Sequence, residues 1–236
     1  MSEIFNDELK RLRSHFMEMG IDASEQIYQA TQAFTNHDPE LAKQVLSGDS
    51  HINTDEVNLE KQALKLMALQ QPVAADFRKI ISILKASTDI ERIGDYASHI
   101  AQCTVRMADH YQDQAIQDNI QQMMMIVRKM LEQIMDAYVF TDEKTAYKVA
   151  NEDLKVDVLY VEQQQRIIGA LKASNDHVTS YETYLNVIRY LERAGDHIVN
   201  LAEWIIYSGS GELVELNPGK ADHHLVERKL REHHTN

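Results

Sequence analysis

Apolar residues recur every three or four positions along most of this chain, and this spacing predicts long amphipathic helices. Residues 6–34 form the first of them, with apolar residues at regular helical steps: Leu9, Leu12, Phe16, Met19, Ala23, Ile27 and Ala30. The stretch "NHDP" ends this helix, because Asp38 can cap a second helix and Pro39 suits its first position. The second helix continues to about residue 69, where "QQP" and Pro72 interrupt it. The beginning of the chain is therefore expected to form two successive helices.

The same pattern continues and predicts six helices in all. The remaining four cover residues 72–107, residues 114–139, a stretch from "TDE" to about Lys172, and a last stretch that ends near Tyr207. The composition agrees, because the chain has only 3 Pro and 8 Gly and is rich in good helix formers. Short β-rich runs bounded by turn residues are missing from the sequence, which argues against a sheet. We therefore expect an all-α protein.

The sequence contains an internal repeat whose clearest marker is the motif E-R-x-G-D. "ERIGDYASHI" begins at Glu91 and "ERAGDHIVNL" begins at Glu192, 101 residues later, each near the end of a long helix. A repeat of this length that holds three helices predicts two tandem three-helix bundles. The first bundle is expected in residues 1–110 and the second in residues 111–208, followed by a polar tail in residues 209–236.

The net charge of −13 limits the kinds of partner that this chain can bind. Lys and Arg are scattered among Asp and Glu, so we expect no binding to nucleic acid or to anionic lipid. The first residues show no signal-peptide pattern and no run of about 18 apolar residues occurs, so we expect a cytoplasmic protein without membrane insertion. Cys103 is the only cysteine, and we expect it to pack as a small apolar residue in a reducing compartment.

The acidic positions of each repeat meet at one level if the last two helices of the repeat form an antiparallel hairpin. Asp49 and Asp95 are centred on position 72, the expected turn, and so are Asn53 and Glu91. The equivalent pairs of the second repeat share a centre within "KASNDH", the turn before the sixth helix. Each hairpin thus gathers four oxygen-bearing side chains. The first acidic cluster is Asp49, Asn53, Glu91 and Asp95, and the second acidic cluster is Asp153, Asp157, Glu192 and Asp196.

Such clusters need a countercharge, because several ionised carboxylates do not crowd together without one. Arg92 and Arg193, which belong to the two motifs, could supply it through salt bridges. A metal ion could supply it instead, and all-oxygen ligands favour Mg, Ca, Mn or Fe. His99, one turn farther along its helix, could add a nitrogen ligand or face solvent. Gly94 and Gly195, each costing a helix about 1 kcal/mol relative to Ala, indicate a close approach of a neighbouring helix or a bound group.

The two motifs, together with "GDSHIN", "EDLKVD" and "QPVAADFRKIISILK", resemble the PhoU family of phosphate-transport accessory proteins. The resemblance extends from about Phe5 to Tyr207 and implies two similar three-helix bundles. It also implies metal ions or multinuclear clusters at the acidic motifs, with iron or zinc as the family's metals. The all-oxygen ligands themselves are also compatible with Mg or Mn. The residues it indicates are Glu91, Asp95, Glu192 and Asp196, with Asp49, Asp153 and Asp157. Asn53 departs from the pattern by replacing a carboxylate with an amide, so weaker metal binding is expected in the first cluster.

The resemblance further implies a function. The expected protein is a cytoplasmic adaptor and not an enzyme. It is expected to link the ATPase subunit of the phosphate ABC importer to the sensor histidine kinase. In this role it would repress phosphate-starvation signalling and uptake when phosphate is ample. Because members of the family often form dimers, a homodimer is expected. Two alternatives stay open: a metal-dependent hydrolase or oxidase using carboxylate-bound metals, and a structural protein whose acidic clusters are salt-bridged. The sequence offers no general base outside the ligand set, which disfavours the enzyme.

Overall fold

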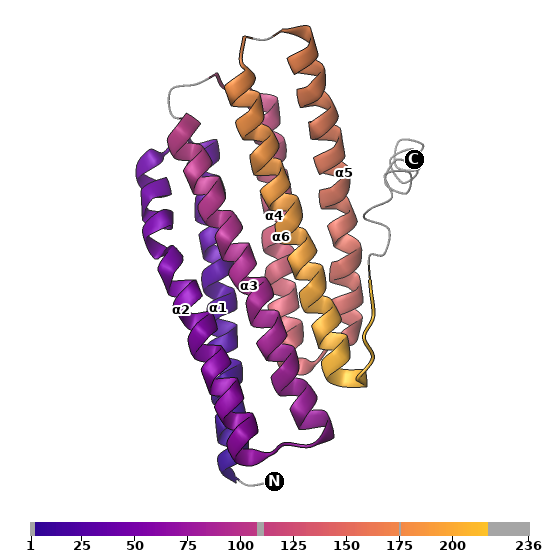
Figure 1. The fold of residues 1–236 in the computed structure, drawn as a ribbon. Coiled ribbons are helices and arrows are strands. Elements are labelled where there is room, and N and C mark those ends of the chain that lie inside the picture. Colours follow the sequence, from indigo (N-terminus) through magenta and orange to yellow (C-terminus); the bar gives the residue numbers. More distant parts are fainter. Residues whose placement is uncertain (1–2, 108–110, 175, 217–236) are drawn as a thin grey trace.

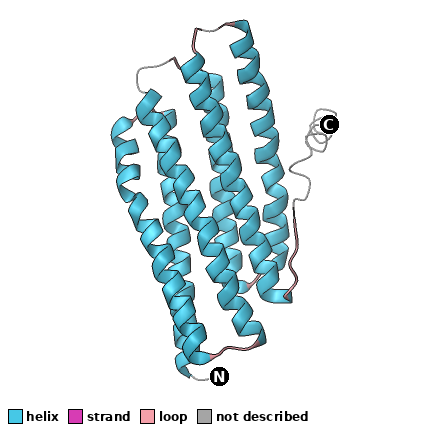
Figure 2. Cartoon of the chain, viewed as in Figure 1, coloured by secondary structure: helices cyan, strands magenta, loops and turns pink. Residues whose placement is uncertain are grey.

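The computed structural model describes residues 3–107, 111–174 and 176–216, which form six long α-helices (Figure 1; Figure 2). The helices are α1 (Glu3–Thr35), α2 (Pro39–Gln70), α3 (Ala74–Met107), α4 (Gln114–Phe140), α5 (Glu143–Ala173) and α6 (Val178–Ser210). No strand occurs in these ranges, which confirms the all-α prediction, and none of these helices could span a membrane. The side chain of Asp49 and the predicted tail from residue 217 onward lie outside the described residues.

Aspartates cap three of the helices, as their sequences favour. The Asp38 carboxylate accepts hydrogen bonds from the backbone N–H groups of Glu40 and Leu41 at 3.0 and 2.9 Å, so it satisfies two donors that α2 leaves unpaired. Asp113 and Asp142 cap α4 and α5 with their own carboxylates. Each such cap stabilises its helix by about 1 kcal/mol. Local sequence therefore decides where these helices begin.

Two helix ends differ from the positions expected from the sequence. The third helix begins at Ala74 rather than at Pro72, because Pro72 lies in the short connection that reverses the chain after α2. The last helix continues past the expected end at Tyr207 and stops at Ser210. There Gly211 takes a left-handed conformation with φ of 83°, and its N–H donates to the Tyr207 carbonyl at 2.9 Å.

Helices α1 to α3 pack as one bundle and α4 to α6 as a second. The two bundles also contact each other, because α3 packs against α6 and α1 packs against α4. The apolar positions expected to face the core of the first helix are all buried in α1. Each fully buried Leu, Ile, Met or Phe side chain contributes about 1.5–3 kcal/mol, so this core holds the two bundles in fixed register.

The seam between α3 and α6 contains a buried polar contact. Asp89 of α3 is 8% exposed and accepts hydrogen bonds from three side chains of α6. The donors are His197 Nδ1 at 2.8 Å, Asn200 Nδ2 at 2.9 Å and Trp204 Nε1 at 3.1 Å. Hydrogen bonds to a charged group are stronger than neutral ones, so Asp89 fixes α6 against α3.

Aromatic rings fill another part of the same seam. The ring of Tyr190 on α6 lies 6.0 Å from the ring of Tyr96 and 5.0 Å from that of His99, both on α3. Between this part and Asp89, the Tyr96 hydroxyl lies 3.4 Å from His197 Nε2. As residue numbers rise along α3, the partners on α6 fall in number, so the two helices run antiparallel.

Candidate functional site

Three carboxylates of the second acidic cluster converge between α5 and α6. Asp153 and Asp157 lie four residues apart on α5, so they share one face of that helix, and Asp196 approaches them from α6. One carboxylate oxygen of each lies within 4.8 Å of the others. Asp153 and Asp157 are 0% and 6% exposed, and Asp196 is half-buried. Glu192, the fourth predicted member, is half-buried one turn before Asp196 and lies outside this group of three.

Gly195 makes room for the most deeply buried of these carboxylates. A Cβ atom at this position would collide with Oδ1 of Asp153, so glycine lets the carboxylate lie against the backbone of α6. At Gly94, the equivalent position of the first repeat, a Cβ would instead lie 3.1 Å from Ile52 and 3.2 Å from Gln26. A close approach was expected at both glycines. At Gly195 it is made by the carboxylate of Asp153, and at Gly94 by side chains of the neighbouring helices α1 and α2.

The donor set of the second cluster fits a hard or borderline cation. Three carboxylates supply only oxygen atoms, and two of them are buried, so their ionised forms require positive charge nearby. His197 directly follows Asp196 in the chain, but its Nδ1 is hydrogen-bonded to Asp89 across the seam. A metal ion bound by Asp153, Asp157 and Asp196 would neutralise the group and connect α5 to α6.

The first acidic cluster has a different arrangement. Asn53 on α2 and Glu91 and Asp95 on α3 are all half-buried. Arg92 Nη1 lies 2.8 Å from Asp95 Oδ2, and Arg92 Nε lies 3.5 Å from Glu91 Oε2. The Glu91 carboxylate, followed by that of Asp95, raises the pKa of the Arg92 guanidinium above its ordinary value. In the first repeat, an arginine therefore supplies countercharge as the salt-bridge alternative requires.

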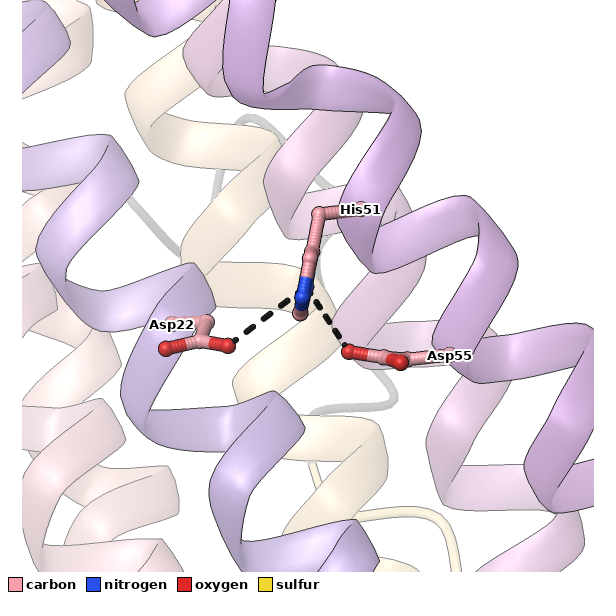
Figure 3. A group of neighbouring side chains, drawn as sticks. All are labelled: Asp22, His51 and Asp55. Carbon is pink, nitrogen blue, oxygen red and sulfur yellow. Dashed lines mark ion pairs between the residues drawn. The ribbon is translucent and has the colours of Figure 1, made fainter.

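The structure also brings together a group of residues that sequence reasoning missed. Asp22 of α1 lies beside His51 and Asp55 of α2, and one ligand atom of each lies within 4.8 Å of the others (Figure 3). The spacing of four between His51 and Asp55, which places them on one face of a helix, was a usable signal. The contribution of Asp22 had no such signal, because it depends on how α1 packs beside α2.

The structure places His99 and Cys103 in the α3–α6 seam. His99 is half-buried and its ring packs on that of Tyr190. Cys103 is 5% exposed, and burial raises the pKa of its thiol to about 11. Since the thiolate is the reactive form, a thiol with this pKa is a poor nucleophile at neutral pH. The expectation that Cys103 packs as a small apolar residue agrees with this position.

A cleft of about 450 Å³ lies where α1, α3, α4 and α6 meet. Its lining includes the cationic side chains of Lys10, Arg13 and Lys79, together with Phe16 and Tyr138. No acidic-cluster residue whose side chain the structure describes lines it. The cleft and the described residues of the acidic clusters are therefore separate features of the structure.

Comparison with known proteins relates both repeats to one family. The PhoU domain model matches residues 16–104 and, a second time, residues 120–205. The phosphate-specific transport system accessory protein PhoU homolog of Clostridium acetobutylicum is 32% identical over 216 residues, 91% of this chain and 98% of the relative. The accessory protein PhoU of Escherichia coli is 31% identical over 88% of this chain and 86% of its own length.

Two crystal structures share the fold. PhoU from Pseudomonas aeruginosa superposes with a TM-score of 0.85 at 33% identity, over 88% of this chain and 100% of that one. The phosphate transport system regulatory protein PhoU from Streptococcus pneumoniae gives a TM-score of 0.84 at 29% identity, over 89% of this chain and 99% of that one. These matches confirm the predicted fold of two tandem three-helix bundles. Because they extend through both repeats, the chain belongs to the PhoU family, as the paired E-R-x-G-D motifs indicate.

Proposed function

We propose that this chain is an accessory regulator of phosphate transport, an adaptor between the ATPase subunit of the phosphate ABC importer and the sensor histidine kinase. In this role it represses phosphate-starvation signalling and uptake when phosphate is ample. The observation that carries the proposal is the match of both repeats to relatives named phosphate-specific transport system accessory proteins. Those relatives are accessory and regulatory proteins by name, so they support a role without catalysis and give the hydrolase or oxidase alternative no support.

The architecture suits an adaptor. Helices of 27 to 34 residues lie side by side, and a helix of 30 residues is about 45 Å long, so the two bundles offer long faces to partners (Figure 1). The net charge of −13 favours partner surfaces that carry basic residues. We place the protein in the cytoplasm as a homodimer, where it would meet the importer ATPase and the sensory region of the kinase.

Metal binding at the acidic clusters is the second part of the proposal. The second acidic cluster is the stronger candidate, because three of its carboxylates converge and Gly195 admits the buried Asp153. The first acidic cluster is the weaker one, since Asn53 offers an amide and Arg92 already pairs with two of its carboxylates. Iron or zinc is the metal that the family implies, and Mg or Mn also suits the oxygen ligands.

An affinity purification from the native host, grown in high and in low phosphate, tests this proposal. The tagged chain should retain the importer ATPase or the sensor kinase, in amounts that change with phosphate. The double variant Asp153→Asn/Asp157→Asn serves as the comparison, because it removes two charges while preserving the shape of both side chains. Elemental analysis of both preparations, purified without chelator, should show stoichiometric metal in the wild type and a lower content in the variant.

The two parts of the proposal fail separately. Absence of both partners under both phosphate conditions would contradict the adaptor role, whatever the metal content. Equal, substoichiometric metal in the wild type and the variant would contradict the metal site and leave the adaptor role standing. Partner recovery that is equal in the two proteins, despite a difference in metal, would assign the metal a structural role.

A further inference from the structure

Asp22, His51 and Asp55 form a compact group between α1 and α2 that shares no residue with either acidic cluster (Figure 3). His51 and Asp55 extend from the same face of α2, and Asp22 faces them from α1. His51 Nδ1 lies 2.9 Å from Asp55 Oδ2 and 3.7 Å from Asp22 Oδ2. One nitrogen and two carboxylates from two helices thus lie within 4.8 Å of one another.

The spacing of these atoms matches that of ligands around one metal ion. Zn²⁺ binds imidazole nitrogen and carboxylate oxygen at about 2.0–2.1 Å, so two ligands of a tetrahedral site lie about 3.3 Å apart. The two distances from His51 Nδ1, 2.9 and 3.7 Å, bracket that value. Small side-chain movements would therefore be enough to place all three ligands on an ion, with water completing the coordination.

The charges around the group also favour a cation. Neither Asp22 nor Asp55 forms an ion pair with a Lys or Arg in the part of the chain that the structure describes. Their ion-pair partners in that part are imidazoles, which carry no charge when deprotonated. This differs from the first acidic cluster, where Arg92 provides a permanent positive charge. Two carboxylates without a Lys or Arg partner carry negative charge that a divalent ion would neutralise.

A fourth side chain orients the group. His15 of α1 has its Nε2 3.5 Å from Asp55 Oδ1, while the other oxygen of Asp55 faces His51. The Asp55 side chain is 18% exposed, whereas those of His51 and Asp22 are 69% and 50% exposed. Asp55 is therefore held from one side and presented to the ion on the other, as outer-shell partners commonly hold metal-binding carboxylates.

We propose that Asp22, His51 and Asp55 bind a divalent transition-metal ion, with Zn²⁺ the best match to one imidazole and two carboxylates. The second repeat has no equivalent of this site. The offset that relates Asp49 to Asp153 places Lys155 and Leu159 at the positions equivalent to His51 and Asp55, and neither ligates a metal. The site is distinct from the acidic clusters and does not depend on the function proposed above.

Zn²⁺ titration of the metal-stripped, full-length chain without a histidine tag tests the site. Isothermal titration calorimetry should resolve, in addition to any binding at the acidic clusters, one site whose affinity falls at least 10-fold in His51→Ala and in Asp22→Asn. His15→Ala should weaken it by about 10-fold, as loss of an outer-shell partner does. His177→Ala is the matched control, because it removes an exposed histidine that stacks on Tyr111 in the other bundle, and it should leave the affinity unchanged.

The Asp153→Asn/Asp157→Asn background separates this site from the second acidic cluster. In that background the Zn²⁺ site should persist, and adding His51→Ala should again lower its affinity at least 10-fold. Circular dichroism should show that His51→Ala and Asp22→Asn keep their helices, because both side chains are exposed. Identical Zn²⁺ affinity and stoichiometry in the wild type, His51→Ala and Asp22→Asn would overturn the proposal and leave these residues as an ion-paired surface group.

Discussion

The α3–α6 seam has two ends, one at Asp89 and the other at Tyr190. They occupy equivalent places in the internal repeat, yet different interactions hold them. Tyr96 and His197 are equivalent residues 101 positions apart, and they meet each other at 3.4 Å. The same offset relates Asp89 to Tyr190. It also relates the three side chains that contact Asp89 to three that surround Tyr190. The first set is His197, Asn200 and Trp204, and the second is Tyr96, His99 and Cys103.

The difference shows how a repeated fold can diverge without losing its geometry. At the Asp89 end, one carboxylate accepts three hydrogen bonds, so the contact depends on a single acceptor. At the Tyr190 end, the rings of Tyr96, His99 and Tyr190 share the contact. Burial raises the pKa of the Tyr190 hydroxyl above its ordinary value. Deleting a buried acceptor leaves its donors unsatisfied, whereas deleting one polar atom from stacked rings leaves their packing intact. The two ends should therefore respond very differently to small changes.

The largest contrast is expected between Asp89→Ala and Tyr190→Phe. Asp89→Ala should lower the free energy of unfolding by about 3 kcal/mol, because three donors of α6 lose their shared acceptor. Tyr190→Phe should change it by less than about 0.5 kcal/mol, since the ring remains. Urea unfolding monitored by circular dichroism measures both values. Similar losses in the two variants would show that the seam does not depend on the Asp89 hydrogen bonds.

The second contrast compares the repeat-related glycines. Gly195→Ala should lower the free energy of unfolding by about 2 kcal/mol, because the new Cβ displaces the buried carboxylate of Asp153. Gly94→Ala should change it by less than about 1 kcal/mol, since Ile52 can shift slightly and alanine favours the helix. Urea midpoints of the two variants give the comparison. Equal destabilisation would mean that the carboxylate is not what makes Gly195 necessary.

Local sequence patterns were enough to predict the helices and part of the second acidic cluster. Apolar spacing and the caps at Asp38 and Pro39 identified the helices, because these signals act within a few residues. The repeat also predicted that Asp153, Asp157, Glu192 and Asp196 would meet, since the two helices of a hairpin share one turn, and all of them but Glu192 converge. The shared turn explains the common level of these side chains but not which of them converge.

The contacts that sequence reasoning missed join elements whose relative position the local pattern does not determine. Asp89 meets Trp204 across 115 residues, and only the docking of the two bundles brings them together. Asp22 reaches His51 because of the register between α1 and α2, which the packing of buried side chains sets. The fourth expected ligand, Glu192, lies outside the converging group, although the hairpin turn places it level with Asp157.

The smallest contrast concerns pH and the Tyr190 end of the seam, where Cys103 is the counterpart of Trp204. Burial raises the pKa of the Cys103 thiol from 9.0 to about 11, so the folded state favours the protonated form. The stability that this provides is complete below pH 9 and is lost as the pH rises toward 11. Between pH 8 and pH 10 the loss should be about 1.4 kcal/mol, which Cys103→Ala should not show. Trp204 does not titrate, so the Asp89 end contributes no equivalent loss. Urea unfolding of the wild type and Cys103→Ala at the two pH values isolates the effect of the thiol, because both proteins contain the same tyrosines. An equal decline in stability in the two proteins would exclude Cys103 as the source of the decline.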